Sequence, residues 1–294
     1  MILDSHTHAW EAWPYDKAVG GPELRGSAET LLRSMDRNSV DRAVVVCARI
    51  GGGVGDAAGY SNDDNNEYVT AFAGRYPDRI VPWVDVDSWW LREYHRPAAA
   101  DRLRSVVNRY GTTGFAHYLN YDLNDGWLRS DPGREFFATA AELNQVASVV
   151  TIGTTWLNDL VAVAHENPSL PILLHHFGIP RRASRYGVDA YDADVAALVA
   201  AARQTNIGVK IAGWSYVTEP TDHYPYPEAL ELLRTLYSSY GPTRLYWGSE
   251  APVSTEHLTY KQTLDIIRVE AEFLPPDDVA RILGGNLASL LASR

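Results

Sequence analysis

The chain has 294 residues, of which 46% are hydrophobic and 21% charged, and its 26 basic against 37 acidic side chains give a formal net charge of −11. This composition is typical of a globular protein and excludes a disordered or collagen-like chain. The negative charge argues against binding to nucleic acid or to anionic membranes, because both carry negative charge themselves.

A single cysteine, Cys47, excludes an internal disulfide and is expected to be a small core residue. The sequence has no run of 18 apolar residues, and residues 1–6 lack the pattern of a signal peptide. We therefore expect a cytoplasmic protein without a membrane segment. A homo-oligomer remains open.

Eight short apolar runs predict β-strands, and helical periodicity follows each of them. In chain order the strands are expected at residues 1–5, 42–49, 80–86, 113–119, 147–152, 171–176, 207–212 and 244–248. The helices are expected at residues 28–38, 65–76, 98–110, 134–144, 156–166, 190–205, 226–240 and 258–273. Residues 277–294 are expected to form two short helices packed on the outside.

Eight strands alternating with eight helices predict one parallel sheet closed into a (β/α)8 TIM barrel. An open doubly wound sheet is the alternative, but it usually has a glycine-rich phosphate turn after its first strand. The glycine run at residues 51–55 follows the second strand and opens no helix, so we interpret it as a flexible loop. No linker, charge run or repeat divides the chain, which predicts a single domain over residues 1–294.

The candidate site lies at the ends of the strands, where this fold places its catalytic groups. His6 and His8 are separated by one residue, so on a strand both imidazoles lie on one face. His176 ends the sixth strand and Glu250 follows the eighth. Two imidazoles and a carboxylate are suitable ligands for a divalent ion such as zinc. Glu250 as an ordinary loop acid is the alternative interpretation.

The orientation of the His175–His176 pair and the roles of Arg49 and Lys210 can also be considered from the sequence. Only one of His175 and His176 is expected to face the lumen, because adjacent strand residues face opposite sides, and the following Phe-Gly-Ile-Pro places His176 at the rim. Arg49 is able to hold a substrate carboxylate with its planar fork, although a salt bridge within the protein is the more ordinary role. Lys210 lies within the seventh strand and is left without a role.

Three segments resemble the signatures of the amidohydrolase-related (amidohydrolase-2) family of the amidohydrolase superfamily. They are residues 4–8 (DSHTH), 175–180 (HHFGIP) and 247–252 (WGSEAP), and residues 282–288 (ILGGNLA) resemble the start of the family's terminal helix. The resemblance implies a (β/α)8 barrel in which His6 and His8 form the metal pair and His176 is the histidine of the sixth strand. Glu250 occupies the place of an aspartate that binds metal or activates water. The family includes lactonases, decarboxylases and a few hydratases.

Two departures from that pattern narrow the metal site. The fifth strand ends in Val-Thr-Ile-Gly without a histidine, and His117 stands where metal-dependent relatives place a lysine that bridges two ions. A binuclear site is therefore not expected. What remains is one divalent ion, zinc or manganese, on His6, His8, Glu250 and His176, or metal-free catalysis in which the histidines polarise a carbonyl group.

The leading hypothesis is a hydrolase that opens a lactone, or a related cyclic ester or amide, of a small carboxylated substrate. Glu250 is expected to deprotonate the attacking water. The groups expected to bind the substrate are Arg49, His117, Tyr118 and Trp214. Aromatic residues in the loops at residues 10–26, 51–64 and 215–226 favour a flat ligand. The alternatives are a metal-dependent decarboxylase of an aromatic or muconate-like acid, with His176 handling the proton, and a barrel that binds a ligand without catalysis.

Overall fold

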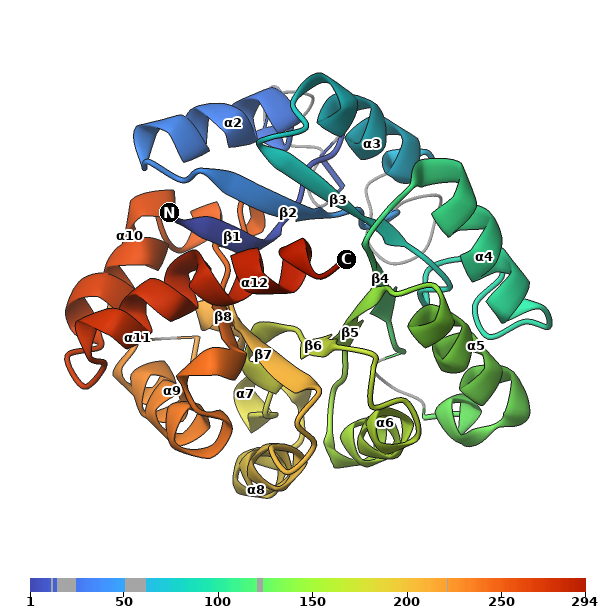
Figure 1. Cartoon of the computed structure of the whole chain (residues 1–294). Helices are drawn as coiled ribbons and strands as arrows, with labels where there is room; N and C mark the ends of the chain where they lie inside the picture. Colours follow the sequence, from blue (N-terminus) through green and yellow to red (C-terminus); the bar gives the residue numbers. More distant parts are fainter. Residues whose placement is uncertain (12, 15–24, 51–61, 121–123, 221) are drawn as a thin grey trace.

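The computed structural model describes residues 1–11, 13–14, 25–50, 62–120, 124–220 and 222–294. Eight parallel strands form one sheet in the order β1 to β8, and helices surround it (Figure 1). The strands are β1 (Leu3–Thr7), β2 (Arg42–Val46), β3 (Ile80–Asp85), β4 (Gly114–Tyr118), β5 (Val146–Val150), β6 (Ile172–Leu174), β7 (Ile207–Ile211) and β8 (Leu245–Trp247). The predicted TIM barrel is therefore confirmed.

Helices follow the strands in the alternating order that the sequence predicts. They are α2 (Ala28–Arg37), α3 (Asn65–Arg75), α4 (Ala99–Tyr110), α5 (Asp131–Glu142), α6 (Thr154–Glu166), α7 (Ala183–Tyr186), α8 (Tyr191–Ala201), α9 (Pro227–Tyr240), α10 (Tyr260–Asp265), α11 (Pro276–Ala280) and α12 (Asn286–Ala292). The short helix α7 has no counterpart among the predicted helices. The segment expected as one helix at residues 258–273 is interrupted, because α10 widens into a π-helical turn over Ile266–Glu270. None of the described helices is both long and apolar enough to cross a bilayer.

Local sequence explains where several helices begin. The Ser27 side chain accepts a hydrogen bond from the Thr30 amide at the start of α2, and Ser130 does the same for Gly133 at the start of α5. Thr259 and Gln262 form a reciprocal capping box at the start of α10. These side chains satisfy amide groups that a helix leaves without partners in its first turn.

The barrel closes where β1 meets the segment that follows β8. The Glu250 amide donates to the His6 carbonyl oxygen (2.8 Å), and the His8 amide donates to the Ala251 carbonyl oxygen (2.7 Å). The Asp4 carboxylate reinforces this junction by accepting from the amides of His6 (3.0 Å) and Ser249 (2.9 Å). This junction places His6 and His8, the first candidate site residues in the chain, beside Glu250, which is the last.

The strand residues divide into an outer and an inner apolar layer, as a period of two requires. Phe115 and Val149 belong to the outer layer beneath the helices, whereas Val46 and Trp83 belong to the inner layer that fills the lumen. Cys47 is buried in the outer layer, as expected of a core residue. The glycine run at residues 51–55 lies outside the described residues.

The carboxyl-terminal helix α12 packs against the amino end of the barrel. Leu287 belongs to the same apolar cluster as Leu3 and Leu173, and a Cβ on Gly284 would lie 2.7 Å from the Leu3 amide nitrogen. In Figure 1 this helix crosses the view close to β1 and β8. Because α12 covers that end, the lumen is left accessible from the end at which the strands finish.

Candidate active site

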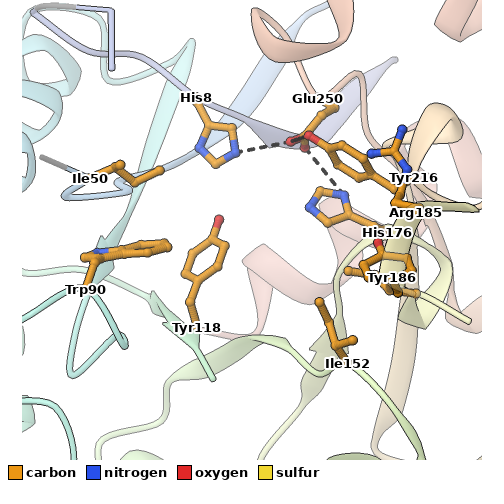
Figure 2. A pocket seen from close by; sticks show the side chains of 11 residues that line it. His8, Ile50, Trp90, Tyr118, Ile152, His176, Arg185, Tyr186, Tyr216 and Glu250 are labelled. Carbon is orange, nitrogen blue, oxygen red and sulfur yellow. Dashed lines mark hydrogen bonds and ion pairs between the residues drawn. The ribbon is translucent and has the colours of Figure 1, made fainter. Parts of the chain in front are cut away.

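A cavity of about 290 Å³ lies at the carboxyl end of the barrel, which is where this fold builds its active sites. Every one of the eight strands contributes to it, through its last residue or the segment that follows. The lining residues are His8, Ile50, Trp90, Tyr118, Ile152, His176, Ile179, Arg185, Tyr186, Tyr216 and Glu250. Figure 2 shows the aromatic side chains around a polar group formed by the two histidines and the glutamate.

Glu250 is the centre of that polar group. Its carboxylate oxygens lie 3.0 Å from His6 Nε2, 3.6 Å from His8 Nε2 and 3.6 Å from His176 Nδ1, and all four side chains are buried. Tyr216 donates its hydroxyl to Glu250 Oε1 at 3.3 Å. The four residues that the sequence predicts as metal ligands or catalytic groups therefore converge on one point.

The second ring nitrogens of the histidines have their own partners. His8 Nδ1 donates to the Val46 carbonyl oxygen at 2.9 Å, which leaves Nε2 facing Glu250. His6 Nδ1 lies 3.2 Å from the Lys210 amine, in the lumen below the site. A backbone carbonyl on the far nitrogen is the support that metal-binding histidines commonly have.

Burial shifts the pKa values of this cluster in directions that suit a metal ion. Burial lowers the pKa of His176 to about 4 and the pKa of His6 well below its ordinary value. The pKa of Glu250 lies well below its ordinary value: burial raises it, but the three imidazoles beside it outweigh that effect. Burial also lowers the pKa of Lys210 well below its usual range. At neutral pH Glu250 is thus a carboxylate and His6 and His176 are neutral imidazoles, the forms in which these groups bind metals.

His6, His8 and Glu250 form a buried group with the spacing of ligands to one metal ion. Ligands about 2.0–2.1 Å from a tetrahedral zinc are about 3.3 Å from one another, and the three distances to Glu250 span 3.0 to 3.6 Å. His6 Nε2 and His176 Nδ1 lie 3.0 and 3.6 Å from Glu250 Oε2, and beyond these mutual contacts the three buried atoms have no hydrogen-bond partner within the described residues. Buried polar atoms in this state are costly, and an ion between them would satisfy all three at once.

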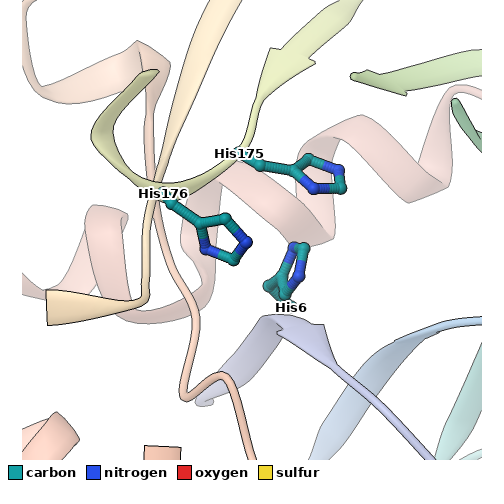
Figure 3. A group of neighbouring side chains, drawn as sticks. All are labelled: His6, His175 and His176. Atoms are coloured by element: carbon teal, nitrogen blue, oxygen red, sulfur yellow. The ribbon is translucent and has the colours of Figure 1, made fainter. Parts of the chain in front are cut away.

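His175 is a site residue that the sequence analysis did not identify. The expectation that only one of the two neighbouring histidines faces the lumen is wrong, because both His175 and His176 approach His6, with ring centroids 4.4 and 4.7 Å away (Figure 3). The strand β6 ends at Leu174, and His176 has a positive φ of 47°, so the alternation of strand side chains no longer applies. These three histidines form a second group with the spacing of metal ligands.

The substrate contacts predicted from sequence are located in different places. Tyr118 lines the cavity, whereas Arg49, His117 and Trp214 do not. Arg49 donates to the Asp63 carbonyl oxygen (2.6 Å) and lies 3.6 Å from Glu93, which is the salt-bridge role named above as the alternative.

Alternation along the strand and packing explain the other two positions. His117 precedes Tyr118 on β4 and so faces the opposite side, where its ring packs on Phe136 with centroids 5.4 Å apart. Trp214 is buried against Phe177.

Trp90 is held in the cavity wall by a buried carboxylate. Asp85, the last residue of β3, accepts from Trp90 Nε1 at 2.8 Å and from the Arg49 amide at 2.8 Å. Burial raises the pKa of Asp85 to about 6. In the sequence, Asp85 lies at the end of a predicted strand and Trp90 follows five residues later. This spacing does not specify the direction in which the indole ring points.

Comparisons with known proteins agree with this arrangement. Residues 3–291 match the family model described as amidohydrolase. An L-fucono-1,5-lactonase from Burkholderia ambifaria is 27% identical over 300 residues, which cover 97% of this chain and 93% of that protein.

Solved structures show the same fold. A zinc-bound amidohydrolase from Burkholderia multivorans superimposes with a TM-score of 0.77 at 19% identity, covering 99% of both chains. A probable 2-pyrone-4,6-dicarboxylic acid hydrolase from Acinetobacter baumannii, with citric acid bound, gives a TM-score of 0.71 at 16% identity over 99% of both chains.

Proposed function

The chain belongs to the amidohydrolase family, and we propose that it is a hydrolase that opens a lactone, or a similar cyclic ester or amide, of a small carboxylated substrate. One observation carries the proposal: a buried carboxylate, Glu250, lies among three imidazoles beside a cavity lined by aromatic and aliphatic side chains. The lactonase from Burkholderia ambifaria supports a lactone as the substrate.

We propose His6, His8, His176 and Glu250 as the ligands of one zinc or manganese ion. Such an ion supplies positive charge that polarises the substrate carbonyl group and lowers the pKa of water. The residues themselves hold their lone pairs toward one point, because the Val46 carbonyl oxygen fixes the ring of His8 and the closure of the barrel fixes Glu250 opposite His6.

In the proposed reaction Glu250 accepts a proton from the water that adds to the carbonyl carbon. The bond between that carbon and the ring oxygen then breaks, and the proton passes to the departing oxygen, so that a hydroxy acid results. Tyr216 positions the Glu250 carboxylate through its hydrogen bond. Tyr118 and Trp90 form the wall against which the ring of the substrate packs.

The test combines the variant Glu250→Gln with the metal content of the purified protein and a panel of lactones. We expect about one zinc or manganese ion per chain in the wild type, and a loss of at least about a thousandfold in hydrolysis for the variant. Glu256→Gln is the matched control, since Glu256 is half-exposed and pairs with Arg25. Its activity should equal that of the wild type.

Three outcomes separate the alternatives. Near-wild-type hydrolysis by Glu250→Gln contradicts the role of Glu250. Active protein without metal, before and after chelation, contradicts the ion and leaves the histidines alone to polarise the carbonyl group. Release of carbon dioxide from hydroxybenzoates, with no lactone opened, contradicts hydrolysis and indicates a decarboxylase.

A further inference from the structure

We propose that Arg185 binds the carboxylate of the substrate and that the cavity thereby selects a single, largely apolar ring carrying that one negative charge. The inference deepens the proposed function. It depends on that function only for the substrate's being a lactone, and the binding of the carboxylate can be tested separately. Arg185 takes the part that the sequence analysis assigned to Arg49, which lies outside the cavity lining.

Arg185 is the one arginine or lysine among the described residues that line the cavity. It lies on the short helix α7, and its guanidinium carbon is 5.4 Å from the centre of the Tyr216 ring. In Figure 2 it lies beside Tyr216, across the cavity from Trp90 and Ile50. Since Tyr216 also donates to Glu250, one side chain connects the proposed catalytic carboxylate to the proposed binding group.

The charge of Arg185 is not neutralised within the described part of the chain. No carboxylate there lies within ion-pair distance of its guanidinium. Its neighbours differ: Arg181 pairs with Asp194 at 2.8 Å, and Arg182 pairs with Glu228 at 2.8 Å. An unpaired guanidinium at the edge of a cavity presents its fork of N–H donors to a ligand carboxylate.

The overall charge of the chain makes a cationic side chain in the cavity wall useful for an anionic substrate. At a formal net charge of −11 the protein repels anions at long range. Arg185 supplies a local positive charge over the ring of Tyr216, separate from the group around Glu250.

Size and lining limit the rest of the ligand. The cavity of about 290 Å³ is at the lower end of the range of small-molecule sites and accommodates about one ring with a substituent. Ile50, Ile152 and Ile179 line it and offer no hydrogen bonds, and the other lining residues with ring faces are Trp90, Tyr118, Tyr186 and Tyr216, the tyrosines with one hydroxyl group each. A flat unsaturated lactone packs on these ring faces over its whole area, so we expect it to be preferred over a sugar lactone.

The experiment compares coumalate, a 2-pyrone with one carboxylate, with its neutral methyl ester. We expect Arg185→Gln to raise the KM for coumalate by about tenfold or more, to leave the KM for methyl coumalate within about twofold, and to change kcat little. Arg185→Lys should recover part of the loss, because the charge remains and the fork does not. Equal changes for both compounds, or no change for either, overturn the inference.

Two controls complete the design. Arg33→Gln on the outer helix α2 changes the net charge equally at an exposed position and should leave both KM values unchanged. Binding of benzoate and benzamide, measured by isothermal titration calorimetry, tests Arg185 even if neither pyrone is opened. In that case the proposed function fails, while a loss of about tenfold for benzoate alone in Arg185→Gln still supports the inference. Wild-type protein that binds benzoate no better than benzamide overturns it.

Discussion

At the scale of single residues, Glu250 combines an unusual backbone with a crowded side chain. Its φ of 58° lies in the left-handed region, which costs energy for a residue with a Cβ. Hydrogen bonds hold the backbone on both sides: the Glu250 amide donates to His6, and the Ser254 amide donates to the Glu250 carbonyl oxygen at 2.8 Å. The structure thereby aims the carboxylate between the imidazoles.

The length of this side chain leads to a prediction. Glu250→Asp should withdraw the carboxylate by about 1.5 Å, enough to lose contacts that are now 3.0 to 3.6 Å long. We expect metal affinity at least about tenfold lower, measured by competition with a zinc indicator, and hydrolysis about a hundredfold lower. Glu256→Asp should change neither. Unchanged zinc affinity in Glu250→Asp would show that the ion, if held, does not depend on this carboxylate.

Four site residues could be predicted from the sequence because they carry the chemistry themselves. His6, His8, His176 and Glu250 are few, reactive and located at strand ends. The substrate contacts were harder to predict. Whether an arginine at a strand end meets a ligand or a protein carboxylate depends on loops far away in the chain, and Arg49 meets Asp63 and Glu93.

At the scale of elements, short strands decide which side chains reach the site. Strand β6 has three residues, and the chain turns directly after Leu174. The turn allows both His175 and His176 to face His6, and His175 Nε2 also meets Ser148 Oγ on β5 at 2.5 Å. The sequence indicates a strand here, but its periodicity does not identify the last residue of the strand, and a shift of one residue changes which histidine faces the lumen.

Close packing of β8 against β1 predicts the effect of one added methyl group. A Cβ on Gly248 would lie 2.7 Å from His6 Cβ and 3.2 Å from Ala212 Cβ. Gly248→Ala should therefore push the strands apart, lower the free energy of unfolding by about 1–3 kcal/mol and weaken metal binding. Urea unfolding and metal titration measure the two effects.

Gly74→Ala is the matched control for that variant. Gly74 lies near the end of α3, and an added Cβ would meet nothing within 4 Å. It should raise the free energy of unfolding by up to about 1 kcal/mol. A Gly248→Ala variant as stable as this control would contradict the close packing of β8 on β1.

At the scale of the whole molecule, the barrel gathers groups that lie far apart in the chain. Each of the eight strands, or the segment that follows it, places at least one side chain in the cavity wall. Helix α12 packs at the amino end of the lumen, so the opposite end alone holds the site. The positions of the site residues thus depend on closure of the complete sheet, which unites residues 6 and 250.

Buried neutral histidines predict that acid destabilises the fold. Burial lowers the pKa of His95 to about 3 and outweighs the opposing effect of the Asp125 carboxylate, which lies 2.6 Å from its Nδ1, and the ring is stacked between Tyr94 and Trp127. The unfolded chain, with a histidine pKa of about 6.5, then binds more protons than the native protein below that pH. The contribution of His95 is complete above pH 6.5 and falls by about 2 kcal/mol on acidification to pH 5.

The variant His95→Asn isolates this contribution. It should be less stable than the wild type at pH 7, because the stacked ring is lost, and the difference should shrink by about 2 kcal/mol at pH 5. Urea unfolding of both proteins at the two pH values measures it. A stability difference that does not vary with pH would mean that His95 titrates normally in the native state.

The sequence by itself determined the barrel and the identity of the metal-binding candidates, because both depend on local information. Strand and helix periodicity repeats along the chain, and a histidine or glutamate at a strand end keeps its chemistry wherever it is placed. Tertiary structure alone decided that His175 joins His6, that Arg49 pairs with protein groups and that Arg185 lines the cavity. These outcomes depend on the last residue of a strand and on loops meeting across the barrel, and no pattern within a single segment specifies either.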